Sequence, residues 1–186
     1  HMRHTHLPEH KFVSGQPETG ADLADDLERI ATNFGPENIA ACIVEPIAGS
    51  TGTLVPPKGY LQKLRETCDK HGILLIFDEV ITGWGRTGSA FASHEFGVTP
   101  DIMTMAKATT NGVVPMGVVA CKDEIYDAVM DASPMGSVEL FHGYTYSGIP
   151  VAVAAALAVQ DIFEKEDIFE RAKNLAPYFQ KGLFSL

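Results

Sequence analysis

The segment Ile73–Glu79 reads Ile-Leu-Leu-Ile-Phe-Asp-Glu and decides the fold class of this chain. A short continuous apolar run of this kind is typical of a strand buried on both faces of a parallel sheet. Ile39–Val44 is another such run, and it ends at Glu45. Between the two runs, residues 59–71 place apolar side chains at helical spacing, and Gly72 is positioned to end that helix. The alternation of strand, helix and strand predicts an α/β sheet with helices on its faces.

Two further strands are predicted downstream, at Asp101–Ala106 and Gly117–Cys121. Only about ten residues separate them, and a parallel crossover needs a dozen or more, so we expect an antiparallel pair. The sheet is therefore predicted to be mostly parallel with one antiparallel strand. The segment 151–163 is apolar nearly all round, so we expect a buried helix there. Ser147 and Pro150 are the expected start signals of this buried helix. A Gly/Ser/Pro-rich stretch is expected to run to Ser137. The other predicted helices lie at 17–33, with Thr19 as the N-cap, at 123–131 and at 167–183.

The composition argues against several functional classes. Lys and Arg number 14 against 24 Asp and Glu, a formal net charge of −10, whereas a nucleic-acid partner needs a basic face. No apolar run approaches the ~20 residues that cross a bilayer, so we expect no membrane partner. Three widely spaced cysteines (Cys42, Cys68 and Cys121) without a C-x-x-C pair favour a reducing, cytoplasmic location and argue against a cysteine metal site.

Polar residues follow the predicted strands at the edge of the sheet where open α/β folds bind ligands. Glu45 follows the first strand, Asp78 and Glu79 follow the second, and Lys107 follows the third. A charged side chain at the end of a buried strand needs a partner or a ligand, because an unpaired buried charge costs several kcal/mol. Two interpretations stay open at this point: a structural salt bridge between Asp78 and Lys107, or a ligand that both residues bind.

One motif is a misleading match to a nucleotide-binding fingerprint. Gly83-Trp-Gly-Arg-Thr-Gly88 satisfies G-x-G-x-x-G, which must directly follow a strand, open a helix and precede an acidic residue by about twenty positions. Here residues 78–82 separate the motif from the strand, and no helix is predicted at Gly88. Lys107 stands where the acidic residue is required. We therefore expect no dinucleotide site.

A lysine and an aspartate at neighbouring strand ends suit pyridoxal phosphate. This cofactor needs an amine for its Schiff base and a carboxylate that keeps its pyridine nitrogen protonated. Its phosphate needs backbone amides and hydroxyls near a helix start, for which Thr145 and Ser147 before Pro150 are candidates. The sequence thus predicts a pyridoxal-phosphate site at Lys107 and Asp78.

Four stretches closely resemble the class III aminotransferases, which are pyridoxal-phosphate enzymes of the aspartate aminotransferase fold. They are Glu45-Pro-Ile-Ala-Gly-Ser, Phe77-Asp-Glu-Val-Ile-Thr-Gly-Trp-Gly-Arg-Thr-Gly88, Ala106-Lys-Ala-Thr-Thr-Asn-Gly112 and His142-Gly-Tyr-Thr-Tyr-Ser-Gly148. The resemblance covers essentially all of residues 3–186. Through Pro46–Gly52 and Val55–Leu61, the chain looks most like the omega-amino acid (β-alanine):pyruvate aminotransferase branch.

The resemblance, carried over residue by residue, assigns the cofactor contacts. It implies that Lys107 forms the Schiff base, that Asp78 binds the pyridine nitrogen and that Val80 packs on the ring face. Trp84 stands where Phe is commoner in the family.

Three further residues receive roles from the resemblance. It implies that Thr145, with the backbone near Tyr144, reaches the phosphate of the neighbouring subunit in a homodimer or higher homo-oligomer. Glu45 corresponds to an acid on the substrate side. No metal ligand is expected.

The activity implied by the resemblance is amino transfer from an omega-amino acid or amine to a keto acid such as pyruvate. An aminomutase of the same fold would use the same lysine and aspartate, and a catalytically silent fragment is the alternative of a different class. Family members are more than twice this length, and their upstream phosphate loop and downstream carboxylate-binding arginine have no counterpart here. We therefore expect a fragment that is inactive alone, with part of the large domain at 1–166 and the first helix of the small domain at 167–186.

Overall fold

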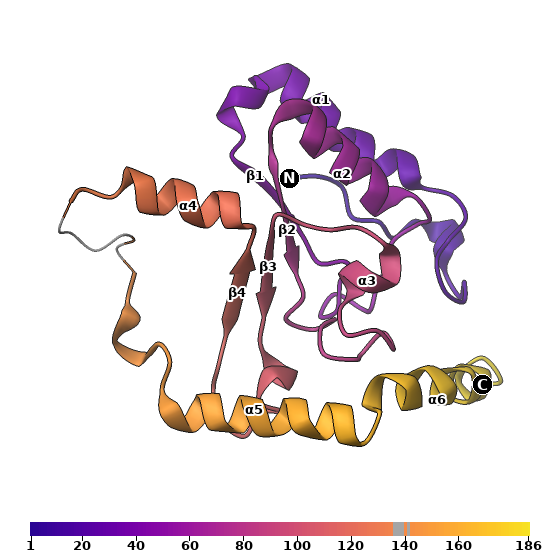
Figure 1. The fold of residues 1–186 in the computed structure, drawn as a ribbon. Coiled ribbons are helices and arrows are strands. Elements are labelled where there is room, and N and C mark those ends of the chain that lie inside the picture. Colours follow the sequence, from indigo (N-terminus) through magenta and orange to yellow (C-terminus); the bar gives the residue numbers. More distant parts are fainter. Residues whose placement is uncertain (136–139, 141) are drawn as a thin grey trace.

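The computed structural model describes residues 1–135, 140 and 142–186, and one four-stranded sheet lies at its centre (Figure 1). The strands lie in chain order across the sheet: β1 (Ala41–Val44), β2 (Leu74–Asp78), β3 (Ile102–Met105) and β4 (Val118–Cys121). The strands β1, β2 and β3 are parallel, and β4 runs antiparallel to β3. The prediction of a mostly parallel sheet with one antiparallel strand is confirmed.

Two pairs of helices among the described residues lie on opposite sides of the molecule. Figure 1 shows α1 and α2 together on one side, with α5 and α6 following one another on the opposite side. In the described part of the chain, no helix is long and apolar enough to cross a bilayer. The stretch predicted to run to Ser137 lies partly outside the described residues. The helices are α1 (Asp25–Phe34), α2 (Tyr60–His71), α3 (Ala92–Phe96), α4 (Asp123–Ala132), α5 (Pro150–Lys165) and α6 (Ile168–Leu183), with 3-10 turns η4 (Lys107–Thr109) and η5 (Tyr144–Tyr146).

The main apolar core lies between α1, α2 and one face of the sheet. Leu64 of α2, Leu27 of α1 and Leu75 of β2 belong to this cluster and are almost completely buried. Successive residues of a strand point to opposite faces, so Ile43 of β1 lies on the other face, and it is 60% exposed. The expectation that Ile39–Val44 is buried on both faces is therefore wrong for the described residues. We call the face that α1 and α2 leave uncovered the open face.

Helix α5 is much more exposed than its composition predicts. Ala152 and Val159 are buried, but Val151 is 64% and Leu157 is 63% exposed. The expectation of a buried helix is wrong for this chain as described, because no described element covers most of the helix surface. An apolar helix with this exposure presents hydrophobic surface that a soluble chain normally covers.

Two predicted helix starts also differ from the structure. A 3-10 turn at Ala21–Ala24 precedes α1, and no side chain of the described residues caps either element, so Thr19 is not the N-cap. Pro150 is the first residue of α5, as expected from its fixed backbone angle. The N-cap position of α5 belongs to Ile149 instead of Ser147.

Candidate active site

Asp78 ends β2 on the open face of the sheet. Its neighbour Phe77 is fully buried on the core side, so alternation places Asp78 on the opposite face. The carboxylate oxygen Oδ1 accepts hydrogen bonds from the Val80 N–H at 3.1 Å and from the Thr104 hydroxyl at 3.3 Å. Thr104 lies directly opposite Asp78 in the register of β2 and β3. Among the described residues, no group donates to Oδ2, which leaves this oxygen available to a ligand.

Glu79, the next residue, has a structural environment. Its side chain is completely buried and accepts hydrogen bonds from the Thr82 hydroxyl at 3.0 Å and from the N–H groups of Ala92 and Ser93 at 2.7 and 2.8 Å. Ala92 and Ser93 open α3, whose first N–H groups lack partners within the helix. The two adjacent carboxylates therefore separate: Glu79 anchors α3, and Asp78 faces the ligand side.

Lys107 begins a tight turn directly after β3. Its φ of +45° is a backbone conformation that costs a non-glycine residue about 1–3 kcal/mol and that is enriched at functional sites. Thr109 donates from its N–H and from its hydroxyl to the Ala106 carbonyl, each at 3.0 Å. The Gly112 N–H donates to the Lys107 carbonyl at 3.2 Å. Hydrogen bonds therefore fix the turn on both sides of the lysine.

The side chain of Lys107 is exposed, and in the described structure it forms no ion pair. The interpretation of Asp78 and Lys107 as a structural salt bridge is therefore wrong. Because β2 and β3 are adjacent and parallel, both residues lie at the same carboxyl edge of the sheet. An amine and a carboxylate are thus presented at one edge without neutralising each other.

The loop Gly83–Gly88 adjoins the lysine turn. Its Trp84 donates the indole N–H to the Thr109 hydroxyl at 2.9 Å. The Trp84 ring packs edge-on against Phe91, with centroids 4.9 Å apart, and lies 6.3 Å from the ring of Phe163 in α5. This loop therefore contacts both the turn that carries the lysine and the end of α5.

Of the other predicted site residues, Glu45 shares the carboxyl edge with Asp78, whereas Tyr144 and Thr145 lie apart from it. Glu45 follows β1, accepts a hydrogen bond from the Gly49 N–H at 3.0 Å, and lines a cavity of about 770 Å³ beside the N-terminal segment. Tyr144 and Thr145 are exposed in η5, and no contact within the described residues joins them to the edge that holds Lys107. The described part of the chain therefore brings Glu45, Asp78, Val80 and Lys107 to one carboxyl edge of the sheet and leaves η5 apart from it.

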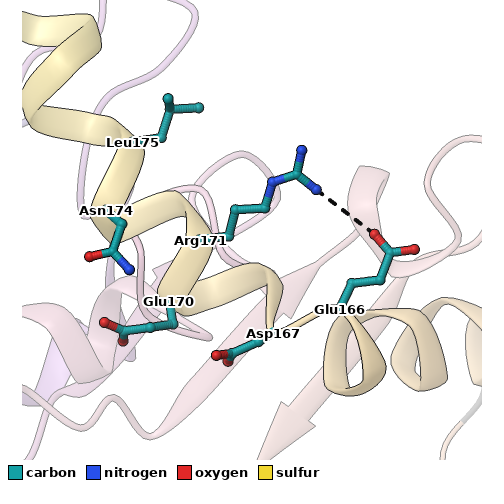
Figure 2. Close-up of a pocket in the computed structure, with 6 residues that line it drawn as sticks. All are labelled: Glu166, Asp167, Glu170, Arg171, Asn174 and Leu175. Atoms are coloured by element: carbon teal, nitrogen blue, oxygen red, sulfur yellow. Dashed lines mark ion pairs between the residues drawn. The ribbon is translucent and has the colours of Figure 1, made fainter.

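A separate hollow of about 520 Å³ lies where α5 passes into α6. Figure 2 shows its lining side chains spread along the start of α6, with Arg171 turned toward Glu166 at 3.9 Å. Both members of this pair are mostly exposed, so their interaction adds little to stability. The hollow shares no residue with the edge that holds Asp78 and Lys107. Its lining residues are Glu166, Asp167, Glu170, Arg171, Asn174 and Leu175.

Comparison with known families identifies the chain. The model of aminotransferase class III matches residues 2–186. The chain belongs to the class III aminotransferases. It is 58% identical over 187 residues to an omega-aminotransferase of Caulobacter vibrioides, and 52% identical over 188 residues to a beta-alanine–pyruvate aminotransferase of Pseudomonas aeruginosa. These alignments cover 100% of this chain and 42% of each relative, so the chain spans less than half of their length.

Solved structures of transaminases share the fold of this class III chain. An (S)-enantioselective omega-transaminase from Thermomicrobium roseum superposes with a TM-score of 0.80 at 46% identity, over 85% of this chain and 34% of that one. An amine transaminase from an uncultivated Pseudomonas species, described as PLP-bound, gives 0.79 at 44% identity, over 85% and 35%. The predicted α/β architecture, part of the large domain of the aspartate aminotransferase fold, is confirmed.

Two residues that support the site in this class III chain were missed by sequence reasoning. Thr104 holds the Asp78 carboxylate, and Thr109 holds the lysine turn. Thr104 is recognisable only once the register of β2 and β3 is known, which hydrophobic patterning does not supply. Thr109 lies two residues after Lys107, but its bond to Trp84 joins segments 25 residues apart. That contact depends on the tertiary fold.

Proposed function

We propose that this chain carries the cofactor-binding centre of an aminotransferase that moves an amino group from an omega-amino acid or amine to a keto acid such as pyruvate. The names of its relatives, an omega-aminotransferase and a beta-alanine–pyruvate aminotransferase, support this substrate class. The proposal rests mainly on the placement of Asp78 and Lys107 at one edge of the sheet without an ion pair between them.

The donor set at this edge fits pyridoxal phosphate. When bound, this cofactor withdraws electrons from the substrate carbon through its protonated ring. Asp78 would hold the ring nitrogen protonated through Oδ2, while Val80 and Thr104 orient the carboxylate through Oδ1. Val80 would also pack on one face of the ring.

Lys107 would supply the amine that attaches the cofactor. Once a substrate amine has displaced it, its free Nζ would act as general base and then general acid, moving the proton that leaves the substrate carbon. The exposed Nζ at the carboxyl edge is free of ion pairs in the described residues, which suits both roles.

The remaining parts of the proposal involve residues other than Asp78 and Lys107. Thr145, with the backbone near Tyr144, would reach the phosphate of a neighbouring subunit in a homodimer or higher homo-oligomer, which suits the exposure of η5. Glu45 would line the substrate side.

We assign residues 1–166 to part of a large domain and 167–186 to the first helix of a small domain, so that the 186-residue chain alone would not turn over substrate. The free thiols of Cys42, Cys68 and Cys121 favour a cytoplasmic location.

Borohydride trapping on the complete gene product tests this proposal. Reduction after addition of pyridoxal phosphate should fix the label on Lys107, within Met105–Thr110, and Lys107→Met should abolish it. Lys122 serves as an internal control, because it is also near a strand end but is paired with Asp101. A label on Lys122 or another lysine in place of Lys107 would overturn the assignment. Product analysis with and without pyruvate separates transamination, which needs the acceptor, from an aminomutase, which does not.

A further inference from the structure

We propose that Trp84 is a positioning residue that holds the turn containing Lys107. This inference rests on the proposed function, in which Lys107 carries the reacting amine. Trp84 and Lys107 are far apart in sequence, and a hydrogen bond from the Trp84 indole to Thr109 at 2.9 Å brings their segments together. Lys107 itself does not contact the indole through any hydrogen bond, so Trp84 acts through Thr109.

The Thr109 hydroxyl transmits this constraint to the backbone beside Lys107. A hydroxyl donates one proton and accepts through its lone pairs. The Thr109 hydroxyl donates to the Ala106 carbonyl at 3.0 Å and accepts from Trp84 at 2.9 Å, so two bonds run in series from the indole to the residue before Lys107. Thr109 is only 3% exposed, so water does not readily replace either bond. Bonds in such a series strengthen each other.

Trp84 is itself held firmly enough to act as a fixed point. Its φ is +63°, and its backbone N–H donates to the Ala90 carbonyl at 2.6 Å. Its ring is packed edge-on against Phe91, with centroids 4.9 Å apart. Backbone and ring contacts thus fix the indole independently of the bond to Thr109.

The lysine turn needs such an external support. Lys107 holds a positive φ, and a strained backbone persists only where surrounding contacts over-determine it. Loss of one buried hydrogen bond should raise the open population of the turn about threefold to tenfold. An open turn moves Nζ away from the edge where Asp78 lies, and catalytic geometry is sensitive to displacements of about 1 Å.

The test uses the complete gene product and the substitution Trp84→Phe, which keeps an aromatic ring and removes the N–H. In the cofactor-free protein, amide exchange of Gly112, whose N–H bonds the Lys107 carbonyl, should accelerate about threefold to tenfold. The rate constant for capture of pyridoxal phosphate should fall about threefold or more, because the closed turn without this bond also holds Nζ less precisely. In capture, Nζ adds to the aldehyde carbon, a C=N bond replaces C=O, and one water leaves. Affinity for deoxypyridoxine phosphate, which lacks the aldehyde, should stay unchanged.

Matched variants separate positioning from general loss of packing. Phe163→Leu weakens the ring cluster but retains the indole N–H, so its capture rate and Gly112 exchange should match the unsubstituted protein. Thr109→Val removes both bonds of the hydroxyl, so its effects should be at least as large as those of Trp84→Phe, and Thr109→Ser, which keeps the hydroxyl, should restore both values. If Trp84→Phe does not fold, replacement of Trp84 by β-(3-benzothienyl)alanine, which keeps the shape of the ring system and lacks the N–H, decides the question.

Three results would overturn the inference: normal capture in Trp84→Phe, equal slowing in Phe163→Leu, or no restoration in Thr109→Ser. A failure of the proposed function is distinguishable, because the unsubstituted protein itself would then show no borohydride label on Lys107.

Discussion

Two adjacent carboxylates, Asp78 and Glu79, should respond in opposite ways to substitution. The Glu79 carboxylate is completely buried and accepts three hydrogen bonds, two of them from N–H groups that open α3. Glu79→Ala leaves three donors unpaired, at about 1–3 kcal/mol each if they stay buried. Allowing for partial relaxation, we expect a loss of about 4 kcal/mol. A domain has only about 5–15 kcal/mol of stability in total, so this variant should be severely destabilised.

Asp78→Asn should leave the fold almost intact. The amide oxygen can still accept from Val80 and Thr104, as Oδ1 does. The free energy of unfolding should therefore change by less than about 1 kcal/mol. Turnover should fall at least about tenfold, because an amide cannot stabilise a protonated ring nitrogen as a carboxylate does. A cofactor analogue with a permanently charged ring nitrogen should restore part of the rate.

Urea unfolding without cofactor, combined with steady-state turnover of the complete gene product, measures both effects. Cofactor is left out of the unfolding experiment because a ligand that binds only the folded state adds to its stability. With an unfolding slope of about 2 kcal/mol per molar urea, Glu79→Ala should lower the midpoint by about 2 M and Asp78→Asn by less than about 0.5 M. If Asp78→Asn unfolds as readily as Glu79→Ala, or keeps normal turnover, the separation of roles is refuted.

Two further predictions concern packing and pH. Gly85→Ala should lower the free energy of unfolding in urea by about 1–3 kcal/mol, because φ is +87° and the new Cβ would lie 2.6 Å from the Phe169 ring. The control Gly97→Ala also lies at positive φ but has open space around it, so it should cost only about 1 kcal/mol. Equal losses in the two variants would contradict the packing argument. Hydrogen bonds from the side chain and N–H of Arg3 lower the pKa of Asp26 from 3.8 to about 2, so their stabilisation is complete above about pH 4 and is lost as the pH falls toward 2. Because Arg3 is 61% exposed, we expect this pair to stabilise the fold by only about 1 kcal/mol. In Asp26→Asn, the free energy of unfolding should therefore change less between about pH 4 and pH 2 than in the unsubstituted protein. An equal pH dependence in both proteins would exclude this pair as its cause.

The parts of the fold that depend on local constraints could be predicted from the sequence. The antiparallel placement of β4 follows from the short connection after β3, because ten or so residues cannot return a chain to a parallel start. The end of α2 follows from Gly72, which adopts φ +66°. The positions of Asp78 and Lys107 follow from their places at strand ends, since adjacent parallel strands bring their carboxyl ends to one edge.

The parts that depend on tertiary contacts could not be predicted in the same way. Asp78 and Glu79 are adjacent and equally acidic, and only the direction of the pleat with the position of α3 separates their roles. The exposure of α5 could not be predicted from its apolar sequence either. An apolar helix predicts burial somewhere, but composition does not say which surface covers it, and Leu157 remains 63% exposed among the described residues.

The glycine spacing of the loop after β2 matches the G-x-G-x-x-G motif, and packing against a helix explains two of its glycines. Gly85 and Gly88 both hold positive φ, at +87° and +88°. A Cβ on Gly85 would lie 2.6 Å from the ring of Phe169, and one on Gly88 would lie 2.6 Å from the Lys173 side chain, so α6 can pack here only against glycine. The same loop carries Trp84, whose indole reaches the turn that presents the lysine. Close approach of α6 therefore accounts for these two glycines, and the loop that they shape joins α6 to the candidate catalytic edge.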